Sequence, residues 1–264
     1  MSLRKSPVVL IALVFMACFW AAIPASANLL LDGSFEKPVV DPTSHCGAYA
    51  YCHGYHTNPT YPPDDSIIGN WVVIGTSDID CTSGQCVPNG HPAPVMLMTD
   101  QYQEKVGNTN DPLYFHVHDG NQAIDLTGEG NQSTDGNTWF QNGVKQTVDL
   151  APGQYQLSFW LGHQDSSAPG YENGPSIISL WINGIEQSLF SNDQNTFHDV
   201  SWEQFFFNFN ASGDTTIAFI SETPLGNNYA GLDDVNLVQT PEPASILLLA
   251  SGLGGILIRR RLRK

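Results

Sequence analysis

Histidines and cysteines form two groups whose residue types and spacing could bind a metal ion. The first group is Cys46, Cys52, His53 and His56, which offers the thiolates and imidazoles of many zinc sites. The second is His116 and His118, which would share one face of a strand but have no third or fourth ligand nearby. In an exported chain, cysteines favour disulfides over thiolate ligands. The residues therefore favour disulfides over zinc.

Two disulfides are the expectation for the cysteines that follow residue 27. These are Cys46, Cys52, Cys81 and Cys86. Spacing favours the local pairs Cys46 with Cys52 and Cys81 with Cys86, although four cysteines allow three connectivities.

Carboxylates are abundant, but they form no recognisable catalytic motif. The chain has 26 acidic residues, so paired-acid glycosidase chemistry is conceivable, yet nothing places two carboxylates at a working distance. A G-x-S-x-G elbow, an H-E-x-x-H motif, a phosphate loop and a dinucleotide fingerprint are all absent from the sequence. We therefore expect that the protein is not an enzyme.

Tyrosines outside the alternating segments could stack on sugar rings, with amides beside them to bind hydroxyl groups. The candidate ligand-binding residues are Tyr49, Tyr51, Tyr55, Tyr61, Tyr171, Tyr229 and Asn227, the last followed by Asn228. The alternative is that these rings only cap loops closed by disulfides.

The first 27 residues have the three parts of a secretory signal peptide. Arg4 and Lys5 precede an apolar run from Val8 to Ile23, and the small residues Ala25-Ser26-Ala27 follow. This order predicts cleavage before Asn28 and disfavours a permanent membrane anchor.

Residues 240–264 have the order of a sorting or anchoring tail. Pro241, Glu242 and Pro243 precede an apolar run from Ala244 to Ile258, and a basic end begins with Arg259, Arg260 and Arg261. The run predicts a short hydrophobic helix, below the roughly 20 residues of a comfortable membrane span. The basic end would stay in the cytoplasm, which leaves the preceding residues outside.

The region between the two ends is strongly acidic. It holds 25 acidic side chains against Lys37, Lys105 and Lys145, a formal charge of −22. Such a surface repels phosphate backbones, so nucleic acid is excluded as a partner. Excess carboxylate makes Ca²⁺ the candidate cation in an exported protein, and a solvated acidic surface is the alternative.

Short alternating runs of β-branched and aromatic residues predict an all-β domain at residues 28–239, a β-sandwich without helices between strands. In one run, Tyr155, Leu157, Phe159 and Leu161 share a face, while Gln156, Ser158 and Trp160 lie on the other. Ala151-Pro152-Gly153 predicts a turn before this run, and Asn183-Gly184 predicts a hairpin. The predicted strands are 28–31, 71–75, 122–126, 139–150, 154–161, 177–182, 203–211, 215–221 and 231–238. Residues 41–65 and 88–111 are predicted as long loops.

The tail resembles the PEP-CTERM sorting signal, through its Pro-Glu-Pro, its glycine-containing hydrophobic run and its terminal arginines. The resemblance implies recognition by an exosortase-type membrane protease in a Gram-negative bacterium that makes exopolysaccharide. It implies a precursor anchored in the inner membrane, and then a mature protein at the cell surface or in the extracellular matrix.

The domain resembles the choice-of-anchor C and DUF642 group of galactose-binding-like jelly rolls. Four segments carry the likeness: residues 28–36, 119–128, 146–159 and 231–237. In related carbohydrate-binding jelly rolls the first and last strands hold a structural Ca²⁺. The resemblance thus implies calcium ligands at Ser34, through its carbonyl, at Glu36, and at Asp233 or Asp234.

The tail and the domain together predict an exported, non-catalytic protein associated with extracellular polysaccharide. The first alternative is a purely structural surface or matrix protein that binds another protein. The second is an enzyme that modifies polysaccharide.

Overall fold

The computed structural model describes residues 27–40, 50–53, 67–74, 78–80, 87–91, 95–105, 112–128, 142–164, 174–194, 199–223 and 229–240. All regular structure in these ranges is β-strand, which confirms the all-β prediction. None of these residues belongs to a helix long and apolar enough to span a membrane. The strands are β1 Ala50–His53, β2 Ile67–Ile68, β3 Trp71–Ile74, β4 Asp78–Asp80, β5 Val87–His91, β6 Val95–Thr99, β7 Gln103–Lys105, β8 Pro112–Tyr114, β9 Gln122–Asp125, β10 Gly143–Gln164, β11 Ser176–Ile182, β12 Ile185–Asn192, β13 Val200–Ser221 and β14 Gly231–Thr240.

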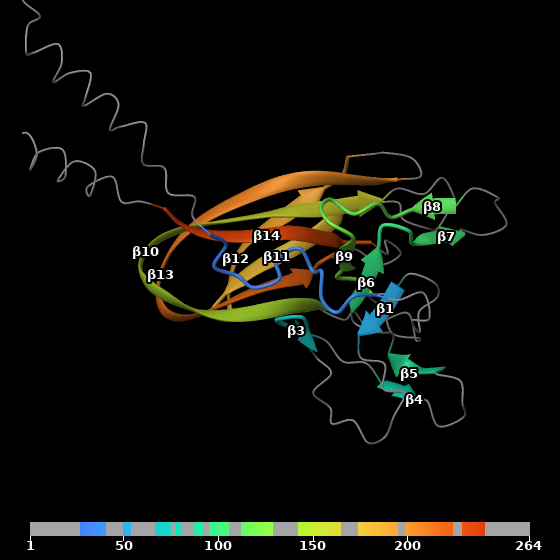
Figure 1. Cartoon of the computed structure of the whole chain (residues 1–264), viewed down its shortest axis with the longest axis horizontal. Coiled ribbons are helices and arrows are strands. Elements are labelled where there is room, and N and C mark those ends of the chain that lie inside the picture. The colour runs from blue at the N-terminus through green and yellow to red at the C-terminus, as the bar shows by residue number, and fades with distance from the viewer. Residues whose placement is uncertain are drawn as a thin grey trace, which may run out of the picture.

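Ten strands form one antiparallel sheet that curls into two layers (Figure 1). The strand order is β1-β6-β9-β14-β10-β13-β11-β12, with β3 added to the first part of β10 and β2 added to β3. β10 and β13 have 22 residues each and pair with one another over almost their whole length. Their curvature carries them from one layer into the other, so a single pair of strands builds the closed end of the sandwich.

The predicted turn at Ala151-Pro152-Gly153 is a bulge inside β10. The register with β13 shifts between Leu150 and Gly153, and the chain continues as a strand on both sides. Opposite the bulge, Gly213 has a φ of 72°, a conformation that glycine adopts without strain. The four strands predicted at 139–150, 154–161, 203–211 and 215–221 are therefore two long bent strands.

Aromatic rings fill the space between the two layers. Phe159 of β10 is fully buried and contacts Phe219 edge-on at 5.0 Å and Phe190 of β12 at 5.1 Å between ring centroids. Phe219 in turn contacts Trp71, which is also fully buried. Every residue of this described core lies between Leu30 and Leu237.

The N-terminal segment runs beside β14 but does not form the predicted strand at residues 28–31. Its backbone groups are bound mainly by side chains instead. Asn28 donates to the Val235 carbonyl and accepts from the Leu237 amide, and Gln146 accepts from the Leu31 amide and donates to the Leu31 carbonyl. Two backbone bonds, from Leu29 N–H to the Leu237 carbonyl and from Val235 N–H to the Gly33 carbonyl, complete the attachment.

The hairpin predicted at Asn183-Gly184 is confirmed, whereas the long loop predicted at residues 88–111 is wrong. Asn183 and Gly184 have φ angles of 52° and 76°, which confirms the two-residue hairpin between β11 and β12. Residues 88–111 are not one long loop, because β6 lies inside this range as a buried strand paired with β9.

Candidate functional site

Side chains on the outer face of β10 and β13 form a surface of amides and aromatic rings, called here the amide-aromatic face. The predicted alternation is confirmed: Tyr155, Leu157, Phe159 and Leu161 are buried, and the residues between them face outward. Register pairs the outward residues across the two strands. The pairs are Gln154 with Asn210, Gln156 with Asn208, Ser158 with Phe206, Trp160 with Gln204 and Gly162 with Trp202.

Trp202 and Trp160 form the centre of an aromatic group at one end of this face. The Trp160 ring stacks on His118, with centroids 3.8 Å apart, and Trp202 meets the same imidazole edge-on at 6.0 Å. A Cβ at Gly162 would lie about 3.0 Å from atoms of the Trp202 ring, so glycine makes room for that ring. Trp202 Nε1 donates to the His116 carbonyl at 2.9 Å, which fixes the ring's orientation.

The aromatic group continues onto the segment before β9. Tyr114 and His116 stack with an interplanar angle of 4° and centroids 5.7 Å apart, and Tyr114 is 40% exposed. His116 Nδ1 lies 2.8 Å from Asp199 Oδ1, and both side chains are about half exposed. The group therefore offers partly exposed rings with one carboxylate at its border.

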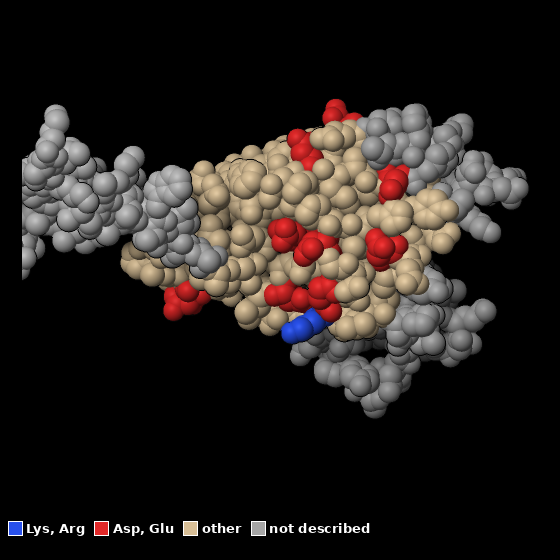
Figure 2. Space-filling model, turned by 45° about the horizontal axis from the view of Figure 1, so that its top comes forward, with Lys and Arg blue, Asp and Glu red and all other residues tan. Residues whose placement is uncertain are grey.

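The amide-aromatic face is uncharged, in contrast to the domain that carries it. The outward positions of β10 from Gln154 to Trp160, and of β13 from Trp202 to Ser212, contain no acidic or basic side chain. Figure 2 shows acidic side chains dispersed over one side of the molecule, with a small group of basic atoms at its lower edge. A neutral face of this size on a domain with a formal charge of −22 marks it as distinct from the general surface.

Two buried or half-buried carboxylates hold the turn that brings His118 to Trp160. Asp233 Oδ2 accepts the main-chain N–H groups of His118 and Asp119, each at 3.0 Å. Glu36 Oε1 accepts those of Asn121 at 2.6 Å and Gln122 at 3.1 Å. Four successive or near-successive amides are thus bound by the oxygens of these two carboxyl groups.

Asp233 is fully buried beneath this turn. Burial raises the pKa of Asp233 to about 7, although hydrogen bonds from the main-chain N–H groups of Asp119, Asp234 and His118 lower it. The carboxyl group is therefore costly to ionise in the folded state.

The predicted calcium ligands come from opposite ends of the domain, Ser34 and Glu36 from its start and Asp233 and Asp234 from its end, and their oxygens are not equally free. Asp233 accepts three main-chain N–H groups, the third from Asp234 at 2.7 Å, so Asp234 is the freer of the two candidates. Asp32 was not predicted, yet its Oδ2 is buried without a hydrogen-bond partner, which is where a hard cation would fit. Within the described ranges, no group of three or more His, Cys, Asp or Glu is arranged to hold a metal ion.

The remaining predicted site residues divide into one that is described and many that are not. Tyr229 is 2% exposed and contacts Phe115 edge-on at 5.1 Å, so its ring belongs to the interior and not to the surface. The following side chains lie outside the described residues: Tyr49, Tyr51, Tyr55, Tyr61, Tyr171, Asn227, Cys46, Cys52, Cys81, Cys86, His53 and His56, and so do the sorting residues Pro241, Glu242, Pro243, Arg259, Arg260 and Arg261.

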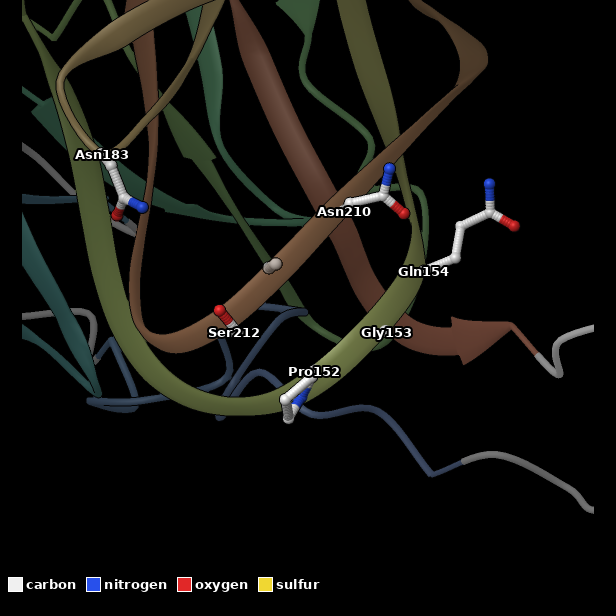
Figure 3. A pocket seen from close by; sticks show the side chains of 7 residues that line it. Pro152, Gly153, Gln154, Asn183, Asn210 and Ser212 are labelled. Carbon is white, nitrogen blue, oxygen red and sulfur yellow. The ribbon is translucent and has the colours of Figure 1, made fainter.

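A hollow of about 730 Å³ lies where β10 and β13 bend, and it shares Gln154 and Asn210 with the end of the amide-aromatic face. Figure 3 shows its lining, which comes from both bends and from the β11–β12 hairpin. The residues are Pro152, Gly153, Gln154, Asn183, Asn210, Ala211 and Ser212. They supply amides and a hydroxyl but no aromatic ring and no ionisable group. The hollow therefore has no acid, no base and no aromatic ring on which a sugar could stack.

Comparison with known proteins identifies the C-terminal tail first. Residues 239–261 match the family described as the PEP-CTERM protein-sorting motif. The chain carries this sorting motif. The match begins at Gln239, so the PEP-CTERM motif overlaps the last two residues of β14. No curated protein matches the sequence of the whole chain.

Solved structures similar to the domain include several carbohydrate-binding modules. TmCBM61 in complex with β-1,4-galactotriose shares 15% identity at a TM-score of 0.38, covering 81% of this chain and all of the module. A family 35 module from Clostridium thermocellum shares 10% identity at a TM-score of 0.34, covering 64% of this chain and 98% of the module. The CBM22-1 xylan-binding domain from Paenibacillus barcinonensis Xyn10C shares 11% identity at a TM-score of 0.34, covering 66% of this chain and 88% of that domain.

Sequence reasoning placed Trp160 on the outward face but did not select it, and it missed Trp202 and Phe206. Alternation along β13 could have identified Trp202 as an outward residue, because it lies between core-facing positions of that strand. The run from Phe205 to Phe207 hides that signal, since rings on both faces of a strand remove the contrast between polar and apolar positions.

Proposed function

We propose that this chain is an exported, non-catalytic protein that binds an uncharged extracellular polysaccharide through the amide-aromatic face. The observation that carries the proposal is the composition of that face, which combines exposed or half-exposed rings with amides and has no charge. Rings stack on the apolar faces of sugars, and amides can donate to and accept from hydroxyl groups. An acidic polysaccharide would be repelled by the surrounding carboxylates.

The spacing of the rings favours a polymer over a single sugar. Trp202 and Phe206 are four residues apart on one strand, a distance of roughly 13 Å. One sugar ring cannot contact both side chains. Gln204 lies between them and is exposed, so an extended chain of sugars along β13 would find a hydrogen-bonding group between two stacking groups.

The sorting motif supports an extracellular address for this activity. We propose that an exosortase-type membrane protease processes the tail, that the membrane holds the precursor until then, and that the mature protein works at the cell surface or in the matrix of a Gram-negative bacterium. A signal peptide at residues 1–27 would direct the export.

The first test is a binding screen of residues 28–240 against neutral, acidic and basic polysaccharides. We expect binding to one or more neutral polymers, with an affinity that increases from disaccharide to longer oligomers. Preferential binding of an anionic polymer, or equal affinity for a monosaccharide, would contradict the proposed face and favour the loops predicted from sequence.

A structural calcium ion remains a proposal from the sequence. Its support in the structure is the buried Asp32 Oδ2, which has no hydrogen-bond partner. The further ligands assigned from the sequence are Glu36, Asp233 or Asp234, and the Ser34 carbonyl, and the described residues do not gather them into a preformed site. Calcium would supply only stability there, because no polar group of the amide-aromatic face is needed to bind it.

We expect the unfolding temperature to be higher in Ca²⁺ than in chelator, because an ion bound only by the folded state stabilises that state. At a free Ca²⁺ concentration about 100 times the dissociation constant, the gain in unfolding free energy is about 2.7 kcal/mol. Thermal scans of the wild type and Asp32→Asn would check this. The rise should vanish in Asp32→Asn and persist in Asp149→Asn, an exposed change of equal charge. A rise that survives Asp32→Asn would rule out this ion site.

A further inference from the structure

β13 leaves one side of its first half open. In the described residues, Val200 to Ala211 pair with β10 alone, whereas the second half of β13 pairs with both β10 and β11. One row of main-chain N–H and C=O groups on this segment therefore faces outward at the edge of the layer. An open edge of this kind is a ready template for another strand.

The open segment also lacks the features that usually protect an edge strand. From Gln204 to Gly213 it has no lysine, no proline and no charged residue of any kind. Its outward Phe206 is 54% exposed, and the inward rings of Phe205, Phe207 and Phe209 are only partly buried. A long aromatic edge that is left bare would promote uncontrolled association.

We infer that this edge pairs with the same edge of a second copy of the chain. Antiparallel pairing of a strand with itself is two-fold symmetric, so one self-complementary strip is enough to close a dimer. The charge distribution selects the strip, because two domains of formal charge −22 repel each other wherever acidic surfaces meet. The segment from Gln204 to Gly213 carries no charge of its own, and only Glu203 and Asp214 flank it, so two copies meet the least repulsion there.

The other edge of the sheet gives a natural comparison. β12 is also an outermost strand and exposes Ile185 and Leu189, but it carries Glu186 and is only eight residues long. Pairing through β13 would also join the amide-aromatic faces of the two copies, because Asn208 of each would lie near the shared axis. This association does not depend on a bound polysaccharide.

Sedimentation velocity of the full chain in a mild non-ionic detergent, without polysaccharide, tests the inference. We expect the wild type to form dimers, and Asn208→Lys to weaken the dimer at least about tenfold, because the variant places like charges across the new strand pair. Gln204→Lys is a second variant at an exposed position of the same edge. Gln187→Lys makes the same change on β12 and should leave the dimer intact.

The outcomes separate this inference from polysaccharide binding. A wild type that stays monomeric would overturn it, and so would a dimer that persists in both edge-strand variants, as association through the tails would produce. An equal effect of Gln187→Lys would also overturn it. Trp202→Ala should remain dimeric, so loss of polysaccharide binding and loss of dimerisation can be observed independently, with circular dichroism confirming that each variant is folded.

Discussion

Replacing Trp202 with alanine should lower the affinity for the bound polysaccharide by about 30-fold or more, near 2 kcal/mol, the scale of an aromatic hot spot. The change removes the ring that lies over Gly162 and meets His118 edge-on. It also removes the donor to the His116 carbonyl, which holds the neighbouring segment. Isothermal titration with the best oligomer from the binding screen would measure the effect.

Trp181 provides the matched control for this experiment. It is a half-buried tryptophan on β11, in the opposite layer, and its Nε1 donates to Ser179 Oγ at 2.8 Å. Trp181→Ala removes a ring of the same size without touching the amide-aromatic face, so its affinity should equal that of the wild type. If both variants lose binding equally, the effect is general and the assignment of the face is wrong.

Asp233 should make the protein less stable as pH rises from about 4 to about 7. Its pKa is raised to about 7 in the folded state from an ordinary 3.8, so the folded state binds the proton more tightly than the unfolded chain. The stability that this proton contributes is complete at a pH below the ordinary pKa, and it is lost as the pH rises through the pKa of the folded state. The difference of about three between the folded and ordinary pKa values corresponds to roughly 4 kcal/mol of unfolding free energy, which is an upper figure for this carboxyl group.

The measurement is the free energy of unfolding of the wild type and of Asp233→Asn between pH 4 and pH 8, in chelator so that no metal contributes. Other carboxylates titrate in both proteins and cancel in the difference. The wild type should lose stability relative to Asp233→Asn up to about pH 7 and no further. Asp149→Asn, an exposed change of equal charge, should show no such difference, and a flat difference for Asp233→Asn would disprove the effect of burial.

The sequence predicted the fold class because its signal is local. Alternation from Tyr155 to Leu161 assigns faces without any knowledge of neighbours, and Asn183-Gly184 specifies a hairpin by its backbone preference. The bend at Pro152 was less predictable. Proline and glycine indicate a turn, but here the partner strand β13 continues past the same point, so the pairing keeps both halves in one strand.

The candidate site could be predicted only in part, because its roles depend on distant contacts. Glu36 and Asp233 were recognised as important acids, yet their N–H partners belong to residues 118–122, more than 80 positions away in sequence. Strand β6 was missed because Met96 and Met98 give a weak strand signal between two polar stretches. No pattern in the sequence joins Trp202 to Trp160, since register across two bent strands brings them together.

The continuity between β14 and the PEP-CTERM tail has a mechanical consequence. Any pull on the tail enters the domain at Thr240 and runs along the axis of β14, which pairs with β10 from Gln154 to Gly162 and with β9 near its start. Ladder bonds between antiparallel strands lie across that axis, so such a force shears them together and does not peel them one at a time. A domain tethered at this end would therefore resist extraction through the whole β14–β10 ladder at once.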